Sequence, residues 1–198
     1  RDLHTTVHSF PTRRSSDLQV ARMTRATVDN AVTTTETDTA DRTYDTRGRL
    51  TYSNTGITEA GLNLNKNYTI ETTIAGYNTI EQVVRMIRKT TDQDLVTTET
   101  DTADRIYDIR GRLLSSSASI REQSGTSLDK TYTVTTSITG YNTLDQVARM
   151  TRATVDNAIT TTETDSADRT YDVRNRLTYS NTGITEAGLN MNKNYTSE

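Results

Sequence analysis

The chain has 198 residues, with 23 Lys and Arg against 26 Asp and Glu, a formal net charge of −3 and no cysteine. This mild acidity gives no electrostatic reason to expect nucleic acid or an anionic membrane as partner, and the lack of cysteine excludes disulfides and thiolate metal sites. Hydrophobic residues make up only 31%, well below the roughly 45–50% of ordinary globular domains, so neither a thick apolar core nor a membrane span is expected.

The first 18 residues differ in composition from the rest of the chain. They hold the only Phe, the only Pro and both histidines of the sequence. The segment RDLHTTVHSFPTRRSSDL resembles the translation of a sequencing-library adapter over its whole length. We therefore expect residues 1–18 to be an artefactual, adapter-derived and disordered tail. The alternative is a short basic disordered tail. In either case residues 19–198 are the part from which fold and function are predicted.

Residues 19–198 consist of internal repeats. The motif QVARMTRATVD begins at Gln19, returns as QVVRMIRKTTD at Gln82 and appears again at Gln146, at spacings of 63 and 64 residues. Five tyrosines mark units of 33, 30, 34 and 30 residues, namely Tyr44, Tyr77, Tyr107, Tyr141 and Tyr171. This periodicity predicts an array in which each unit packs against its neighbours.

The first predicted strands surround a tight turn. Residues 33–44 are rich in Thr, which favours strands, and residues 49–52 are expected to begin the returning strand. Between them, Gly48 is replaced by Asn175 in the nearly identical third copy. Gly and Asn are the residues that most readily adopt positive φ. We therefore predict a turn in which Asp45 accepts main-chain hydrogen bonds.

The next predicted strands show a period of two. Residues 68–74 place Tyr, Ile, Thr and Ile at every second position, and residues 131–140 repeat this alternation. Strict alternation is typical of a strand with one half-buried face. Over residues 146–155 the spacing of the apolar residues also permits a helix, but a strand is the preferred interpretation. Each unit is therefore predicted to be a β-hairpin.

The motif YDxRGRL resembles the RHS/YD-repeat family. It appears as YDTRGRL, YDIRGRL and YDVRNRL, with YNTIEQV and YNTLDQV as degenerate copies, and the resemblance covers essentially all of residues 19–198. Departures are Asn at positions 78 and 142, Asn at 175 and a spacing longer than the family's commonest unit. The residues that form the motif are Tyr44, Asp45, Gly48, Arg49, Leu50, Tyr77, Tyr107, Asp108, Gly111, Arg112, Leu113, Tyr141, Tyr171, Asp172, Asn175, Arg176 and Leu177.

The resemblance implies a fold and a function. The expected fold is all-β, with repeated antiparallel β-hairpins forming a segment of an open curved (spiral) sheet, and residues 19–198 are expected to be a fragment of such an array. The implied function is structural: part of the β-shell that encapsulates a C-terminal toxin in a large bacterial protein, secreted or at the cell surface. The expected partners are neighbouring repeats of the same chain and an encapsulated toxin segment. The alternative is an adhesin-type repeat module that binds carbohydrate, such as a cell-surface glycan, or protein.

No catalytic, cofactor-binding or metal-binding residue is predicted. Residues 19–198 contain no His and no Cys, which excludes Ser-His-Asp and Cys-His machinery, and the chain is not expected to be an enzyme. The acidic motif TETDTAD, which holds Glu36, Asp38 and Asp41, is chemically suited to calcium. The preferred interpretation is a solvated strand face whose charge is partly offset by nearby arginines.

Two further sets of residues are given structural interpretations. Tyr44, Tyr107 and Tyr171 are expected to pack across their hairpins and not to act as sugar-stacking platforms. The arginines of QVARMTR, Arg22 and Arg25, are expected to be ordinary surface charges and not phosphate ligands, because acidic residues accompany them in every unit.

Overall fold

The computed structural model describes residues 19–197, and the predictions made for residues 1–18 lie outside this range. Over these residues the chain forms sixteen strands and no helix, which confirms the all-β prediction. The paired strands are antiparallel, and consecutive strands such as β1 and β2 form hairpins, as predicted. Strand β2, however, pairs with β4, and β12 pairs with β15. Within residues 19–197, no helix has the length and apolarity needed to cross a membrane.

The strands recur in the same order in three successive copies of the repeat. The first copy contains β1 (Thr24–Asp29), β2 (Val32–Asp38), β3 (Thr43–Tyr44), β4 (Leu50–Gly61) and β5 (Leu64–Tyr77). The second contains β6 (Val83–Asp92), β7 (Leu95–Asp101), β8 (Ile106–Tyr107), β9 (Leu113–Ser124) and β10 (Leu128–Tyr141). The third contains β11 (Val147–Asp156), β12 (Ile159–Asp165), β13 (Thr170–Tyr171), β14 (Leu177–Tyr179), β15 (Thr182–Gly188) and β16 (Met191–Ser197). The strand equivalent to β4 is therefore split into β14 and β15 in the third copy.

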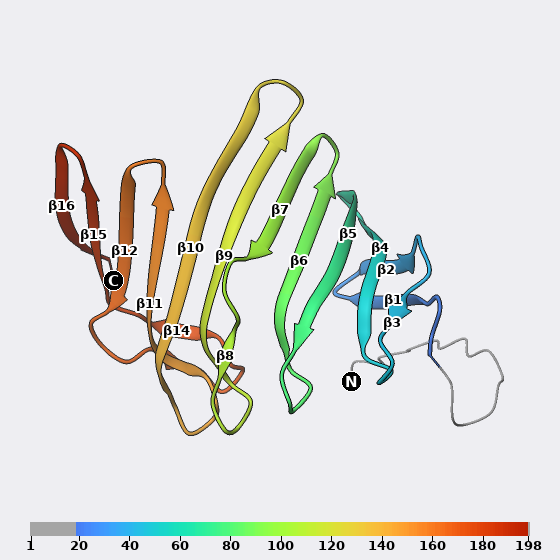
Figure 1. The fold of residues 1–198 in the computed structure, drawn as a ribbon, viewed down its shortest axis with the longest axis horizontal. Helices are drawn as coiled ribbons and strands as arrows, with labels where there is room; N and C mark the ends of the chain where they lie inside the picture. Colours follow the sequence, from blue (N-terminus) through green and yellow to red (C-terminus); the bar gives the residue numbers. More distant parts are fainter. Residues whose placement is uncertain (1–18, 198) are drawn as a thin grey trace. The chain divides into compact units, whose positions relative to one another are not determined.

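The hydrogen-bonding order of the strands follows the sequence. A 14-stranded sheet has the path β1-β2-β4-β5-β6-β7-β9-β10-β11-β12-β15-β16, with β3 paired to β4 and β8 paired to β9 (Figure 1). Strands β13 and β14 form a separate pair. Because β1 and β16 each have a single neighbour on this path, the sheet is open, as predicted.

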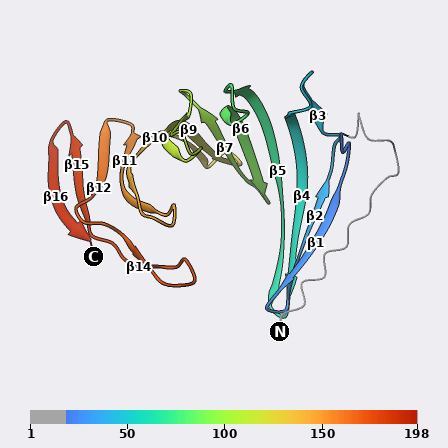
Figure 2. The ribbon, with the colours of Figure 1, turned by 90° about the horizontal axis from the view of Figure 1, so that it is seen from below.

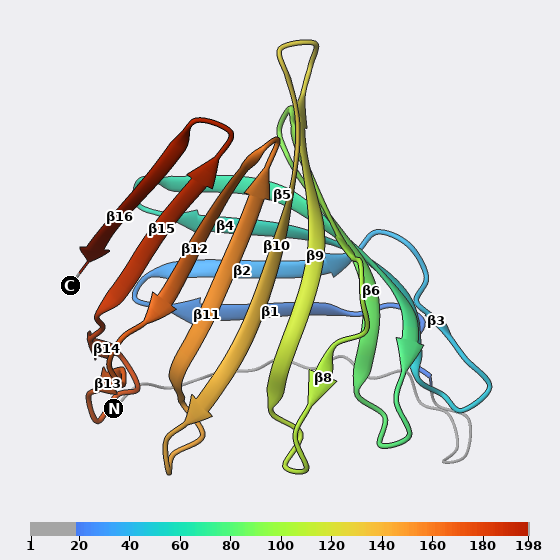
Figure 3. The ribbon, with the colours of Figure 1, turned by 60° about the vertical axis from the view of Figure 1, so that its left-hand side comes forward.

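The contacts between residues divide the chain into two compact units. In the first, β1, β2, β4 and β5 lie side by side (Figure 2). In the second, β11, β12, β15 and β16 do the same (Figure 3). Within the described range, the first unit comprises residues 19–81, 86–98 and 122–129, and the second comprises residues 82–85, 99–121 and 130–197.

The sheet has almost no apolar core. Among residues 19–197, the buried hydrophobic residues are Ala118 and Ala148 alone. From Val134 to Thr139 positions alternate between half-buried and exposed, which confirms the predicted period of two. Because so little apolar surface is removed from water, hydrogen bonds and ion pairs carry an unusual share of the specificity of this fold.

The strand predicted over residues 33–44 is interrupted, and the prediction of one continuous element is wrong. Strand β2 ends at Asp38 and β3 begins at Thr43. Between them the Thr39 N–H donates to the carbonyl oxygen of Asn54, and the Arg42 N–H donates to that of Ala21, both at 2.8 Å.

The segment for which a helix was the alternative forms a strand. Residues 147–156 are β11, so the strand interpretation of that segment is confirmed.

The turn predicted at residues 45–48 is present. Oδ1 of Asp45 accepts the main-chain N–H groups of Arg47 and Arg49, both at 2.9 Å. Gly48 has a φ of 77°, and Asn175 at the equivalent position has a φ of 62°. Both parts of the prediction, positive φ and an accepting aspartate, are therefore confirmed.

Substitution of Gly48 should separate the effect of φ from that of side-chain size. Gly48→Ala is expected to lower the free energy of unfolding by about 1 kcal/mol, because alanine is strained at positive φ. Gly48→Asn should cost clearly less, because Asn175 already adopts this conformation. Steric overlap does not contribute to the loss, because the atom nearest to an added Cβ, Nε2 of Gln19, is 3.7 Å away. Urea unfolding followed by circular dichroism measures both variants, and equal losses would contradict the prediction.

Candidate functional site

Each tyrosine of the repeat motif binds main chain that lies well before it in the sequence. The hydroxyl groups donate to carbonyl oxygens 24 to 28 residues earlier: Tyr44 to Val20, Tyr77 to Leu50, Tyr107 to Val83, Tyr141 to Leu113 and Tyr171 to Val147, at 2.5–2.8 Å. The prediction that these tyrosines pack across their own hairpins is therefore incomplete. Four of the acceptor residues are the first residues of the strands that leave the preceding turn, and Val20 is at the corresponding position of the first copy. These bonds therefore link successive turns. We call this set of five hydrogen bonds the turn ladder.

The aspartate of each YD turn forms an ion pair with the arginine four residues later. Arg49 and Arg112 approach the carboxylates of Asp45 and Asp108 to 2.6 Å, and Asp172 and Arg176 form the same pair at 2.6 Å. The guanidinium groups of Arg49 and Arg112 also lie over the rings of the next tyrosines, Tyr77 and Tyr141, at 4.5 and 4.4 Å. A planar guanidinium can bind a carboxylate and stack on a ring at the same time. The arginine thus joins its own turn to the next one.

The electrostatics of the turns favour the protonation states that these contacts require. Hydrogen bonds from the main chain of Arg49, and then from its guanidinium group, hold the pKa of Asp45 below its ordinary value. Burial raises the pKa of the Tyr77 and Tyr141 hydroxyls. At neutral pH the aspartate is therefore an acceptor and the tyrosines are donors, as the geometry needs.

The degenerate YN turns have the same geometry as the YD turns. Oδ1 of Asn142 accepts the N–H groups of Leu144 and Gln146 at 2.9 and 3.0 Å. The residues at the position of Gly48, Glu81 and Asp145, adopt φ values of 65° and 60° without being glycine. The departures from the motif at positions 78 and 142 therefore leave the turn unchanged.

The remaining motif residues lie in the same turns and at the starts of the following strands. The Gly111 carbonyl accepts a hydrogen bond from Nε2 of Gln82 at 3.0 Å, and Oδ1 of Asn175 accepts one from Nε2 of Gln146 at 2.9 Å. Leu50 and Leu113 contribute their carbonyl groups to the turn ladder, whereas Leu177 begins β14 and is 49% exposed. The structure thus places the whole predicted set at the turns.

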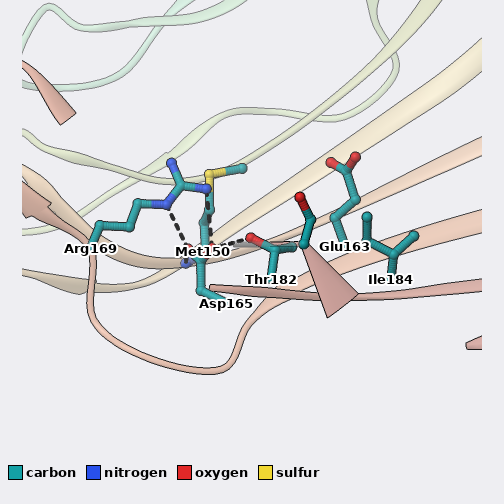
Figure 4. A pocket seen from close by; sticks show the side chains of 7 residues that line it. Met150, Glu163, Asp165, Arg169, Thr182 and Ile184 are labelled. Carbon is teal, nitrogen blue, oxygen red and sulfur yellow. Dashed lines mark hydrogen bonds and ion pairs between the residues drawn. The ribbon is translucent and has the colours of Figure 1, made fainter. Parts of the chain in front are cut away.

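A second repeated cluster was missed by the sequence analysis. Asp38, Asp101 and Asp165, the second acidic residues of the TETDTAD-type motifs, are buried. Asp165 accepts hydrogen bonds from the Met150 N–H at 2.9 Å, from Nε of Arg169 at 2.9 Å and from Oγ1 of Thr182 at 3.2 Å (Figure 4). We call Asp165 and these donors a buried carboxylate cluster, and use the same term for the groups around Asp38 and Asp101.

The first copy contains the same cluster. Asp38 accepts from the Met23 N–H at 2.8 Å, from Nε of Arg42 at 2.8 Å and from Oγ1 of Thr55 at 3.0 Å. In the second copy Arg105 binds Asp101 at 3.0 Å. The interpretation of this acidic residue as part of a solvated face is therefore wrong. The signal in the sequence is an Asp followed four residues later by an Arg in every copy.

The third acidic residue of the motif behaves differently. Asp41 and Asp168 pair with Arg22 and Arg149, and both aspartate side chains are 69% exposed. The solvated interpretation holds for these residues, and Arg22 is a surface charge, as predicted. No group of three or more acidic or histidine side chains in residues 19–197 is arranged to hold a metal ion.

A small cavity lies beside the buried carboxylate cluster of the third copy. It has a volume of about 170 Å³ and is lined by Met150, Glu163, Asp165, Arg169, Thr182, Ile184 and Ser197. In Figure 4 the Asp165 carboxylate is directed at Arg169 and Thr182, and Glu163 stands apart from it. The buried acid is therefore engaged in holding the strands and does not present its oxygens to a ligand.

Comparisons with known proteins find no relative of this chain: no family model matches it, no curated protein matches it, and no solved structure matches it. The contacts of the turns use the motif residues to bind main chain and one another.

Proposed function

We propose that residues 19–197 are a structural repeat segment of a large secreted or surface protein, and form part of the wall of a β-shell that encloses a C-terminal toxin segment. The chain is then a non-catalytic scaffold of the RHS/YD-repeat type. The observation that carries this proposal is the near absence of buried apolar side chains: among residues 19–197, Ala118 and Ala148 are the buried hydrophobic residues. A wall that is wetted on both faces has no need of a dry core.

The contacts within the repeats support a scaffold role. The turn ladder and the buried carboxylate clusters use polar contacts that recur from copy to copy. Stability in such an array grows by adding copies, because each copy supplies contacts to its neighbours. A long wall can therefore be built from this repeat without any change in its chemistry.

The rival function is an adhesin module that binds glycans or proteins. The tyrosines that would serve as stacking platforms, Tyr44, Tyr107 and Tyr171, donate their hydroxyls to main-chain carbonyls. This use of the hydroxyls favours the scaffold function. Binding to a glycan would instead support the adhesin function, and the experiment below includes that outcome.

The test is protection of a cargo in the complete protein. Sequencing of the source locus with long reads gives the reading frame on both sides of this chain, and the whole protein is then expressed and treated with a non-specific protease. We expect the segment that follows the repeats to resist cleavage for as long as the repeats remain intact. A control in which a protease site is inserted at the exposed Leu62, at the tip between β4 and β5, should open the wall and expose the segment.

Two results would overturn the proposal. One is a following segment that is cleaved as fast in the intact protein as in the control. The other is a reading frame that leads from the repeats into a membrane or cell-wall anchor, with binding of the purified protein to a glycan array. That result would establish the adhesin function instead.

A further inference from the structure

Each unit of the sheet has a face whose central rows carry no charged side chain. In the second unit, the row of residues that pair across five strands and end at Asn194 consists of Thr135, Ala153, Thr162, Thr185 and Asn194. The rows on either side of it contain only Ser, Thr, Asn, Gly, Ala and Val. In the first unit the equivalent row consists of Ala26, Thr35, Thr58 and Asn67, and its neighbouring rows contain only Thr, Asn, Gly, Ala and Val. We call these two surfaces the hydroxyl faces.

Charged side chains of the same strands lie on the opposite face. Arg152 is opposite Glu163, and Glu186 is opposite Lys193, at positions shifted by one residue from the rows of the hydroxyl face. In a strand, a shift of one residue places a side chain on the other side of the sheet. Asp165 of the buried carboxylate cluster has this shifted register as well. A bulky group attached to the hydroxyl face therefore leaves these charges in place.

A hollow lies on each hydroxyl face, beside a glycine that has no side chain to fill it. The hollow of the first unit has a volume of about 320 Å³, and its lining includes Thr37, Gly56, Thr58, Asn67 and Thr69. The hollow of the second unit has a volume of about 520 Å³, and its lining includes the equivalent residues Thr164, Gly183, Thr185, Asn194 and Thr196. Hydroxyl and carboxamide groups both donate and accept hydrogen bonds. Each hollow therefore combines open space with groups that suit the hydroxyls of a sugar.

The asparagine in each hollow begins the triplet Asn-x-Thr. The triplets are Asn67-Tyr68-Thr69 and Asn194-Tyr195-Thr196, and no other asparagine of the sequence has Ser or Thr two positions later. This triplet is the acceptor for N-linked glycosylation when its middle residue is not proline. The asparagine and threonine of both triplets are exposed, and the period of two places them on the same face of the strand. The acceptor groups therefore lie on the face that has room for a glycan.

We propose that Asn67 and Asn194 are acceptors for N-linked glycans, and that the first sugar of each glycan lies over the hollow beside it. In the transfer, Nδ2 of the asparagine forms a bond with C1 of the sugar, and the bond between C1 and the pyrophosphate of a lipid-linked oligosaccharide donor breaks. The lipid pyrophosphate leaves, and the nitrogen gives its proton to a base of the oligosaccharyltransferase. This inference rests on the secreted or surface location in the proposed function, because such enzymes act on chains that are being exported.

Export of the full 198-residue chain through the secretory pathway of a eukaryotic cell tests the proposal. Export is needed because both acceptors lie within paired strands in the folded chain, so transfer has to occur before the sheet forms. A cleavable signal peptide and a linker with one reporter acceptor triplet precede the chain, and the reporter shows that the chain has met the transferase. We expect glycans at Asn67 and Asn194 as well. Peptide N-glycosidase removes them and converts each asparagine to aspartate, which mass spectrometry locates.

Substitutions within the triplets provide the controls. Asn67→Gln and Asn194→Gln should each remove one glycan. Thr69→Val should remove the glycan at Asn67 although the asparagine remains, whereas Thr69→Ser should keep it. A secreted chain that is glycosylated at the reporter but at neither Asn67 nor Asn194 would overturn the proposal.

The position of the glycan is tested by moving one acceptor to the opposite face. In an Asn194→Gln background, Thr161→Asn with Glu163→Thr creates an acceptor triplet on the side of β12 that faces away from the hydroxyl face. The thermal unfolding midpoint of each glycosylated chain is compared with that of the same sequence made without glycans in bacteria. Glycans should not lower the midpoint of the wild type, because they lie over open space, but should lower that of the moved-acceptor variant by several degrees. Equal falls would overturn the placement over the hollows.

The outcome is separate from that of the cargo-protection experiment. An added signal peptide exports the chain, so glycosylation is measured whether or not the repeats enclose a segment. An unglycosylated chain would leave the wall function standing, and an unprotected cargo would leave the glycosylation result standing.

Discussion

Replacement of Asp165 by alanine is expected to lower the free energy of unfolding by about 3 kcal/mol. Its side chain is only 1% exposed, and its removal leaves the Met150 N–H, the Arg169 guanidinium and the Thr182 hydroxyl without their acceptor. Loss of one partner of a buried ion pair costs about 3–5 kcal/mol, because the other charge stays behind unpaired. The lower end applies here, since the Arg169 side chain is 23% exposed and can be partly hydrated.

Asp168→Ala is the matched control for this variant. Asp168 also pairs with an arginine, Arg149, but its side chain is 69% exposed. Removal of an exposed ion pair costs under about 1 kcal/mol. Urea unfolding of the two variants and the wild type, followed by circular dichroism, gives the comparison. Losses of equal size would show that the buried carboxylate cluster has no special importance for stability.

Replacement of Tyr141 should show the contribution of the turn ladder in two steps. Tyr141→Phe removes the hydroxyl that donates to the Leu113 carbonyl, which is expected to cost about 1 kcal/mol. Tyr141→Ala also removes the half-buried ring beneath the Arg112 guanidinium, and the total loss should reach about 2–3 kcal/mol. The loss of unfolding free energy in Tyr141→Phe gives the contribution of the hydrogen bond. The further loss in Tyr141→Ala gives the contribution of the ring.

Tyr195→Phe is the control for the hydroxyl step. The Tyr195 hydroxyl donates to Glu186 in an exposed position and takes no part in the turn ladder. Its removal should have a smaller effect than that of the Tyr141 hydroxyl. Hydrogen exchange provides a local measurement, because main-chain amides of residues 108–113 should exchange faster in Tyr141→Phe. Unchanged exchange there, with equal losses of stability in the two Phe variants, would contradict a linking function for the ladder.

The turns were the part of the candidate site that could be predicted from sequence. A Gly at position 48 that becomes Asn at position 175 indicates positive φ, and an Asp three residues earlier indicates an accepting carboxylate. Both features depend on interactions within five residues, and both are present. The wall function and the family resemblance rest on the same motifs and stay proposals.

The buried carboxylates could not be predicted in the same way. Asp38 is the last residue of β2, a strand whose two faces are both polar in sequence, so the pattern of hydrophobicity gives no direction for its side chain. Its burial depends on Arg42 folding back over it and on Thr55 arriving from β4. The second of these contacts follows from strand pairing, which no local pattern describes.

The repeat motif alone determined the all-β class, the hairpin units and the turns, because φ preferences and the alternation of side chains act over a few residues. Only the tertiary structure decided which aspartate of TETDTAD is buried and which carbonyl receives each tyrosine hydroxyl. Apart from the pairing of the aspartate with the arginine four residues later, those contacts join residues 15 to 28 positions apart. They form only when the register between neighbouring strands brings donor and acceptor within hydrogen-bonding distance.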